Sequence, residues 1–271
     1  MDGLFLKQSP AEGNEETEMT AGELKKKLLN GQQVYGTMVS AFDTPEISRI
    51  LKNAGFSWFF YDGEHGYPNA DRLYGIFAYA RFCGIPALMR IPEINKTEVF
   101  RALDSGADGI VCPNVETSEQ AQELVRLAKY DPLGERGVSF TRPHTGYRKV
   151  NALEYMESAN LDTILICQME SPRGLSNLDE ILGIEGVDGI LVGPNDLTAS
   201  MGIINQLQHP DYLAAVERAF QLCREHGKIA GISGKDLNVL RGWGEKGATL
   251  LQWGTDVSLL MAMIRSGGFA T

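Results

Sequence analysis

The sequence has no apolar run long enough to cross a membrane. Of its 271 residues, 43% are hydrophobic and 22% are charged, and no uninterrupted apolar run approaches the ~20 residues that span a bilayer. Segment 1–20 also lacks a basic stretch followed by a long apolar one and a cleavage site. We therefore expect a cytoplasmic protein without a membrane partner, in which residues 1–20 form a flexible acidic leader.

Cysteine and clustered positive charge are both scarce. The four cysteines, Cys83, Cys112, Cys167 and Cys223, are widely spaced and form no C-x-x-C pair, so buried reduced thiols are expected in preference to a metal or redox site. The formal net charge is −10 and the longest basic run is Lys25 to Lys27. Nucleic acid is disfavoured as a partner, because phosphate binding needs a basic surface. A small anionic ligand would need a local cation or metal.

Glycine motifs for nucleotide binding are absent, since no G-x-G-x-x-G opens a helix after a strand and no Walker loop occurs. The sequence instead contains eight short apolar runs, mostly separated by segments of helical periodicity. These runs are VYGTMVSAF, WFFYDGEH, IPALMRI, DGIVCPN, TILICQME, DGILVGPND, KIAGIS and TLLQWGT. Apolar strands alternating with helices are typical of a parallel sheet covered on both faces. Eight such units favour a single-domain (β/α)8 TIM barrel over residues 21–271, in preference to an open doubly wound sheet.

Two segments stand outside this alternation. Thr20 and Glu23 have capping-box spacing and predict a short helix that Gly31 ends. The connection between residues 130 and 163 is longer than a simple turn, and loops of this length are often lids or binding loops. We therefore predict that residues 136–150 close over the functional site.

Polar residues follow the ends of several apolar runs. In a barrel the carboxyl ends of the strands meet on one face, where barrel enzymes keep their chemistry. The residues at these ends are Asp62, Glu64, His65, Arg90, Asn114, Gln168, Glu170, Asn195, Asp196 and Asp256. Arg90 is notable because it interrupts the apolar stretch PALMRIP. Glu170 and Asp196 carry the hard oxygen ligands that hold Mg²⁺ or Mn²⁺, although Asp196 could instead cap a helix.

The histidines and lysines are less informative. His65 alone is more simply interpreted as a structural residue, and so are His144, His209 and His226. His226 precedes a glycine at a helix end, where positive charge suits the helix dipole. No lysine lies at a strand end comparable with those of the other site residues, since Lys228 opens its strand, and a Schiff-base mechanism is not expected.

Seven stretches, taken together, resemble one known family. They are GEHG at 63–66, MRIPE at 89–93, ALDSGADGIVCPNV at 102–115, GERGVSF at 134–140, QMES at 168–171, EGVDGILVGPNDLTASMG at 185–202 and WGTDVSLL at 253–260. In this order, from Val34 to Leu260, the chain resembles the class II pyruvate-dependent aldolases of the HpcH/HpaI family. The resemblance implies a (β/α)8 barrel of the phosphoenolpyruvate/pyruvate type with an extra C-terminal helix. It also implies a homohexamer in which that helix packs on a neighbouring subunit.

The resemblance also implies a role for each matched site residue. Glu170 and Asp196 would be the metal carboxylates, Arg90 the cation that binds pyruvate, and His65 the general base. The metal implied is Mg²⁺, Mn²⁺ or Co²⁺. The role of Glu64 stays open between binding a metal-bound water and capping the turn.

Further residues match supporting positions of the family. Asp62 and Asp104 would support the histidine, and Gln168, with the backbone around Pro194 and Asn195, would line the pyruvate carboxylate. The sequence departs from the family where SFTRPH follows the arginine of GERGV and where QWGTD ends the last strand. These departures leave the identity of the aldehyde open.

These observations predict a metal-dependent aldolase that reversibly cleaves a 4-hydroxy-2-oxo acid to pyruvate and an aldehyde. Breaking the C3–C4 bond leaves an enolate, so the site needs fixed positive charge at the 2-oxo oxygen. It also needs a base for the C4 hydroxyl proton, and histidine suits proton transfer at neutral pH.

Two alternatives remain at this point. One is another metal-enolate reaction of the pyruvate barrels, catalysed by a 2-oxo acid decarboxylase or an acyl-CoA lyase. The other is a non-catalytic barrel that binds a 2-oxo acid. The presence of His65, Arg90, Glu170 and Asp196 together argues against the second.

Overall fold

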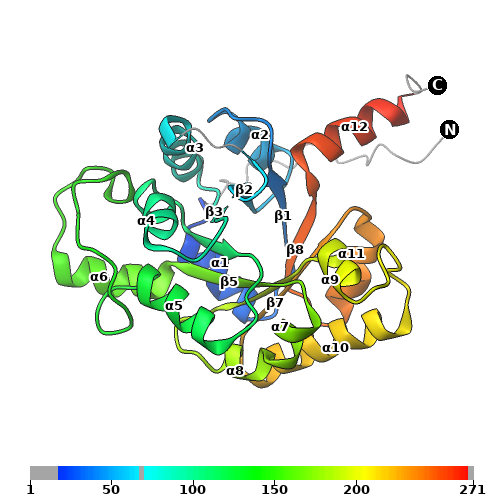
Figure 1. Cartoon of the computed structure of the whole chain (residues 1–271). Coiled ribbons are helices and arrows are strands. Elements are labelled where there is room, and N and C mark those ends of the chain that lie inside the picture. The colour runs from blue at the N-terminus through cyan, green and yellow to red at the C-terminus, as the bar shows by residue number, and fades with distance from the viewer. Residues whose placement is uncertain (1–17, 67–69, 268–271) are drawn as a thin grey trace.

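The computed structural model describes residues 18–66 and 70–267, and eight strands within them close into one barrel (Figure 1). Neighbouring strands pair in parallel in chain order, and the last strand pairs with the first. They are β1 (Val34–Val39), β2 (Trp58–Asp62), β3 (Ala87–Arg90), β4 (Gly109–Cys112), β5 (Ile164–Met169), β6 (Gly189–Val192), β7 (Ile229–Gly234) and β8 (Leu250–Thr255). The predicted (β/α)8 barrel is confirmed, whereas most of the expected leader lies outside the described residues.

Helices surround the barrel and alternate with its strands (Figure 1). They are α1 (Ala21–Leu29), α2 (Ile47–Asn53), α3 (Ala70–Cys83), α4 (Lys96–Asp104), α5 (Ser118–Ala128), α6 (Ala152–Asp162), α7 (Pro172–Ser176), α8 (Leu178–Leu182), α9 (Pro194–Ser200), α10 (Pro210–Glu225), α11 (Leu237–Glu245) and α12 (Asp256–Ser266), with a 3-10 turn at Pro143–Thr145. Thr20 and Glu23 form the predicted capping box at the start of α1. None of the helices in the described ranges is long and apolar enough to cross a membrane.

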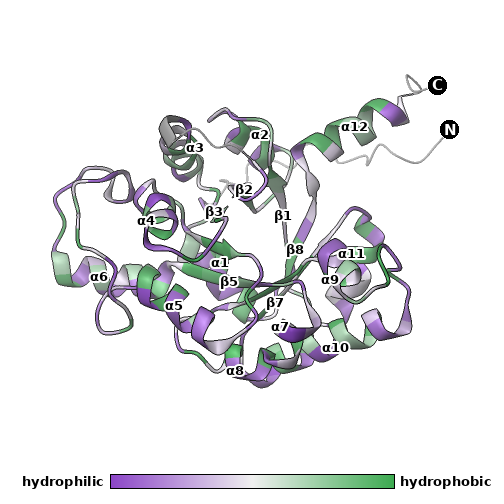
Figure 2. Ribbon diagram, in the orientation of Figure 1, coloured by the Kyte–Doolittle hydropathy of each residue, from purple (hydrophilic) through white to green (hydrophobic). Residues whose placement is uncertain are grey.

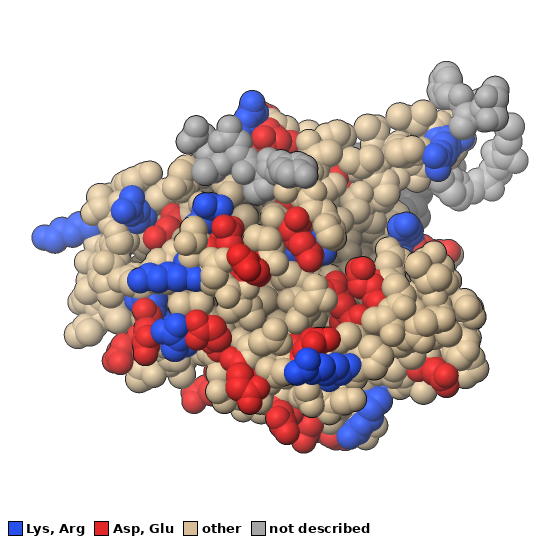
Figure 3. Space-filling view, in the orientation of Figure 1, with Lys and Arg blue, Asp and Glu red and all other residues tan. Residues whose placement is uncertain are grey.

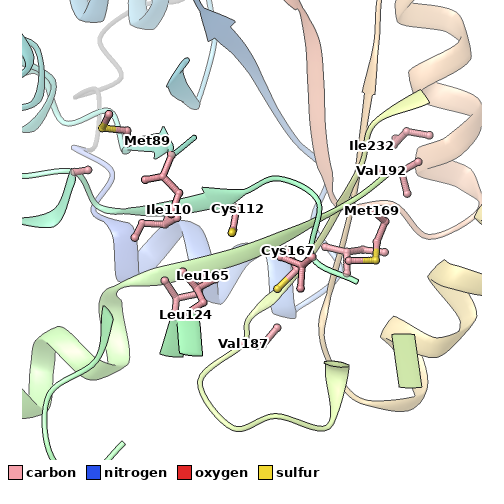
Figure 4. Close-up of a cluster of buried hydrophobic side chains, with 14 of the residues drawn as sticks. Met89, Ile110, Cys112, Leu124, Leu165, Cys167, Met169, Val187, Val192 and Ile232 are labelled. Atoms are coloured by element: carbon pink, nitrogen blue, oxygen red, sulfur yellow. The ribbon is translucent and has the colours of Figure 1, made fainter. Parts of the chain in front are cut away.

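One apolar layer fills the space between the strands and the surrounding helices. Alternate strand residues point to opposite sides of a sheet, and Figure 4 shows part of the outward-pointing set, with Cys112 and Cys167 among apolar side chains. All four cysteines are buried and free. Burial raises the pKa of the Cys167 and Cys223 thiols to about 12. The prediction of buried reduced thiols is confirmed.

A second apolar layer fills the barrel interior. It contains the inward-pointing residues of the strands, such as Trp58 and Phe60, together with Leu24 and Leu28 of α1. Gly36 is paired with Trp58 in the β1–β2 register, and the indole occupies the space that any side chain at position 36 would need. Figure 2 shows the central strands as mainly hydrophobic, with more hydrophilic residues on the surrounding helices. Because α1 precedes β1 and packs on this layer, it covers the end of the barrel where the strands begin.

The predicted lid lies at the wrong end of the barrel to cover the site. Segment 136–150 follows α5 and leads, through α6, into the start of β5, and helix-to-strand connections of a barrel lie at the amino-terminal ends of its strands. Nη1 of Arg81, near the C-terminus of α3, donates to the carbonyl oxygens of Pro143 and His144 at 3.1 and 2.9 Å. These bonds hold the segment against the end that α1 covers. The lid prediction was wrong because it used the length of the connection and not its position in the strand–helix order.

Candidate active site

Four polar side chains of the barrel interior collect beyond its apolar layer. Asp62, Arg90 and Gln168 each stand two residues after an interior apolar residue of the same strand, and Glu170 directly follows β5, four residues after the interior residue Ile166. The two-residue period of a strand therefore turns all four inward at the carboxyl ends. Their exposed fractions are 1%, 6%, 4% and 5%, respectively, so water cannot provide their usual solvation and each needs a partner.

Arg90 is held by two carboxylates. Its Nε and Nη2 lie 2.9 and 2.8 Å from Oδ1 of Asp62, and its Nη1 lies 3.0 Å from Oε2 of Glu64. Burial raises the pKa of Asp62, but the hydrogen bonds and charge of Arg90, with the backbone N–H groups of His65 and Glu64, outweigh burial and lower it. Asp62 is therefore an ionised anchor for the guanidinium.

The turn after β2 depends on two glycines. The N–H of Gly63 donates to the carbonyl oxygen of Arg90 at 2.8 Å, and a Cβ at position 63 would lie 2.5 Å from that same oxygen. A Cβ at Gly66 would overlap the carbonyl oxygen of Asp62. The chain can thus turn tightly enough to present His65, whose side chain is 73% exposed and whose Nε2 lies 3.9 Å from Oε2 of Glu64.

Within this chain, the two aspartates that were expected to support His65 pair with arginines. Asp62 accepts a hydrogen bond from the backbone N–H of His65 at 3.2 Å, but its carboxylate holds Arg90. Asp104 ends α4, at the opposite end of the barrel, and pairs with Arg136 at 3.0 Å. Each aspartate thus pairs with its own buried guanidinium, Asp62 with that of Arg90 and Asp104 with that of Arg136. Within this chain, Glu64 carries the carboxylate beside His65.

Glu170 is a buried carboxylate with an unusual charge environment. Its Oε2 accepts a hydrogen bond from the backbone N–H of Asn114 at 3.0 Å, which the left-handed conformation of Asn114 makes possible (φ 52°). Burial raises the pKa of Glu170 to about 7, and the negative charges of Asp196 and Glu64 act in the same direction. The hydrogen bond from Asn114 and the charge of Arg90 oppose this increase only in part. A bound cation would offset both the cost of burying the Glu170 carboxylate and its repulsion by the other two carboxylates.

Gln168 and Glu170 meet at Gly193. A Cβ on this glycine would lie 2.9 Å from Oε1 of Glu170 and 3.2 Å from Nε2 of Gln168, so the absence of a side chain leaves room for both. Oε1 of Gln168 is buried without a hydrogen-bond partner. An unsatisfied acceptor beside a carboxylate is expected to take a ligand atom or water.

The arrangement of acidic side chains fits an open metal site. Asp196 lies in the first turn of α9 and is exposed, and it is near enough to Glu170 to raise that residue's pKa. Across residues 18–66 and 70–267, no three His, Cys, Asp or Glu side chains are placed to hold a metal together. Two carboxylates with no third ligand match the way Mg²⁺ binds, with water and substrate oxygens in the remaining positions.

The other predicted residues are placed as follows. Pro194 and Asn195 open α9 directly after Gly193, where Pro194 is half-buried and Asn195 is exposed. Asp256, directly after β8, is buried and accepts hydrogen bonds from the backbone N–H groups of Ser40, Ala41 and Phe42, in the segment after β1. Asp256 therefore fastens two strand ends to each other.

One residue at the open end was missed in the sequence. Lys235 directly follows β7, at the carboxyl end of the barrel, so the expectation that no lysine stands at such an end was wrong. Its side chain is exposed. A Schiff-base lysine is normally activated by desolvation or by a neighbouring cation, so exposure does not favour that role. The residue stands two positions after the end of the apolar run KIAGIS.

The remaining histidines have structural partners. His144 is buried, with Nδ1 2.6 Å from the Tyr155 hydroxyl, and its pKa is lowered by burial and by Arg136. His209 caps α10, and His226 lies 2.8 Å from Asp179. These contacts agree with the structural interpretation of all three.

Comparison with known proteins agrees with the barrel fold. A model of the family described as HpcH/HpaI aldolase/citrate lyase matches residues 37–262. The chain is 34% identical over 238 residues to a hydroxypyruvate/pyruvate aldolase of Roseobacter denitrificans, covering 88% of this chain and 92% of that protein. It is also 34% identical over 237 residues to a 5-keto-4-deoxy-D-glucarate aldolase of Salmonella arizonae, with the same coverage of 88% and 92%. The crystal structure of an HpcH/HpaI aldolase from Desulfitobacterium hafniense superposes with a TM-score of 0.87 at 35% identity, covering 90% of this chain and 95% of that one.

Proposed function

Because the chain belongs to the HpcH/HpaI aldolase/citrate lyase family, we propose that it is a divalent-metal-dependent class II aldolase that cleaves a 4-hydroxy-2-oxo acid to pyruvate and an aldehyde. Its relatives are named as aldolases, which are carbon–carbon lyases. The observation that carries the proposal is the convergence of Arg90 with the Glu170 and Asp196 carboxylates at one end of an otherwise apolar barrel.

The reaction moves one proton and one electron pair away from C4. A base takes the proton of the C4 hydroxyl, the C3–C4 bond breaks, the aldehyde leaves, and the electron pair remains in the pyruvate enolate until C3 is protonated. His65, exposed on its turn, would act as the base, directly or through water. Arg90 would donate charge-assisted hydrogen bonds to the oxygen that becomes negative.

The buried carboxylate of Glu170 and the nearby carboxylate of Asp196 would hold the metal. A bound Mg²⁺, Mn²⁺ or Co²⁺ would supply fixed positive charge at the 2-oxo oxygen. Gln168, together with the backbone at Pro194 and Asn195, would line the substrate carboxylate. Asp62 keeps the guanidinium of Arg90 in place for the reaction, because its two contacts leave the guanidinium little freedom to rotate.

Pyruvate release after metal removal tests this function. The purified protein, stripped with EDTA and dialysed, is expected to lose its ability to release pyruvate from 4-hydroxy-2-oxo acids, and Mg²⁺, Mn²⁺ or Co²⁺ should restore it. Release is followed with a coupled pyruvate assay over a panel of such acids, and metal content is verified separately. Full activity in excess EDTA after verified metal removal contradicts the class II assignment, and products other than pyruvate with an aldehyde contradict the reaction.

We also propose that α12 packs on a neighbouring subunit. The helix extends away from the barrel (Figure 1), and Leu260, Met261, Met263 and Ile264 on it are 47%, 44%, 67% and 49% exposed. Four large apolar side chains on one exposed helix are characteristic of an interface.

The mass of the protein in solution tests this packing. Light scattering is expected to give an oligomer, with a hexamer as the specific prediction from the family. Ile264→Glu should yield smaller species, because it places a charge in an apolar contact. Val239→Glu, at another exposed apolar residue, is the matched control and should leave the mass unchanged. A monomeric wild-type protein would refute the interface.

A further inference from the structure

Arg90 contacts two carboxylates in unlike surroundings. Asp62, which contacts Nε and Nη2, has a side chain that is 2% exposed, and it also accepts the backbone N–H groups of residues 64 and 65. Glu64, which contacts Nη1, has a side chain that is 18% exposed. Asp62 is therefore built into the structure, whereas Glu64 stands on the more accessible side of the guanidinium.

The second carboxylate opposes the proposed role of Arg90. One carboxylate already balances the charge of the guanidinium, and Glu64 adds negative charge that also acts on Glu170. The proposed substrate is an anionic 2-oxo acid, which this negative charge repels. On the surface shown in Figure 3, acidic side chains are spread among scattered Lys and Arg residues. A carboxylate on Nη1 has the same chemistry as a substrate carboxylate or an enolate oxygen, and it competes for the same donor.

Glu64 also has a second partner within reach. The oxygen that contacts Arg90, Oε2, lies 3.9 Å from Nε2 of His65. This gap is longer than a hydrogen bond, and both side chains can rotate between staggered rotamers about their single bonds. A carboxylate on one imidazole nitrogen orients the ring and stabilises its protonated form.

We propose that Glu64 is a positioning residue that exchanges partners during the reaction. It balances Arg90 before substrate binds, the negatively charged oxygen of the substrate displaces it, and it then pairs with His65 and orients the imidazole for proton transfer. Binding of the substrate would thereby prepare the base. This inference rests on the proposed function for the roles of Arg90 and His65.

Glu64→Gln separates the two halves of the exchange. The carboxamide keeps the shape but loses the charge, so it competes less for Arg90 and supports His65 less. Oxalate, a planar mimic of the enolate, is expected to bind the Mn²⁺-loaded variant about fivefold more tightly in calorimetry. The kcat for pyruvate release should fall roughly ten- to a hundredfold. Tighter binding with slower turnover is a split that a purely structural ion pair would not produce.

Two further variants decide the interpretation. Glu93→Gln removes the same charge from the exposed segment after β3, and it should change neither quantity. In a His65→Ala background, Glu64→Gln should cost no further kcat, because the residue it supports is gone. Weaker oxalate binding in Glu64→Gln, or an undiminished kcat loss in the double variant, would overturn the exchange. If the wild type released no pyruvate, the proposed function would fail, while the oxalate titration, which needs no turnover, would still test competition at Arg90.

Discussion

Arg90→Lys is expected to lower kcat for pyruvate release by about a hundredfold or more, since loss of one preorganised donor at a developing oxyanion costs on the order of 3 kcal/mol. The guanidinium reaches Asp62 through Nε and Nη2 and still presents Nη1 to another anion. The ammonium group of lysine is a compact point charge without this planar fork, so it cannot make both contacts in the same directions.

The control for this change is Arg101→Lys. Arg101 pairs with Glu98 at 2.9 Å, and its side chain is 44% exposed. An exposed ion pair contributes only about 0 to 1 kcal/mol, so this variant should keep its activity. Both variants should fold and bind Mn²⁺, because Glu170 and Asp196 are unchanged. If the folded, metal-loaded Arg90→Lys protein kept more than about a third of the wild-type kcat, a loss below ~1 kcal/mol, Arg90 would not bind the reacting oxygen.

Glu170→Gln is expected to abolish metal binding and, with it, most of the activity. Loss of a residue that only supports a metal ligand typically costs ~10–100-fold, so loss of a ligand should exceed ~100-fold. Binding is measured directly by calorimetry with Mn²⁺ and by the increase of Tm that Mn²⁺ produces in the wild type. Glu180→Gln, on the exposed side of α8, is the control and should retain both. Unchanged Mn²⁺ affinity in Glu170→Gln would remove Glu170 from the metal site.

In the absence of metal, the ionisation of Glu170 makes the stability of the wild type depend on pH. The pKa of Glu170 rises in the folded state from 4.5 to about 7, so the folded protein binds more protons than the unfolded chain between these values. The contribution of Glu170 to the free energy of unfolding is therefore fully present below about pH 4.5 and is lost as the pH rises through about 7. This loss is on the order of 3 kcal/mol at 1.4 kcal/mol per pKa unit.

Glutamine has no such proton, so denaturant titrations of metal-free Glu170→Gln should show a smaller decline of stability over this window. The variant should be at least as stable as the wild type near pH 8. A wild type and a variant with parallel pH profiles would show that Glu170 is not desolvated as the structure indicates.

The sequence by itself determined the barrel and the composition of its open end. Apolar strands alternating with helices leave few other architectures, and the two-residue period of a strand turns Asp62, Arg90 and Glu170 to the same side as the interior residues before them. Both features depend on neighbours along the chain. For that reason they could be predicted without knowing which strands lie side by side.

Only the tertiary structure decided how these side chains pair. Asp62 and Arg90 are 28 residues apart, and Asn114 and Glu170 are 56 apart, so their contacts depend on which strands lie side by side, and no local pattern contains that. The same holds for segment 136–150, whose length suggested a lid although its contacts with Arg81 lie at the opposite end. Burial and charge act through space. The pKa of Glu170, the partner of Asp62 and the position of Glu64 between Arg90 and His65 were therefore settled only when the barrel closed.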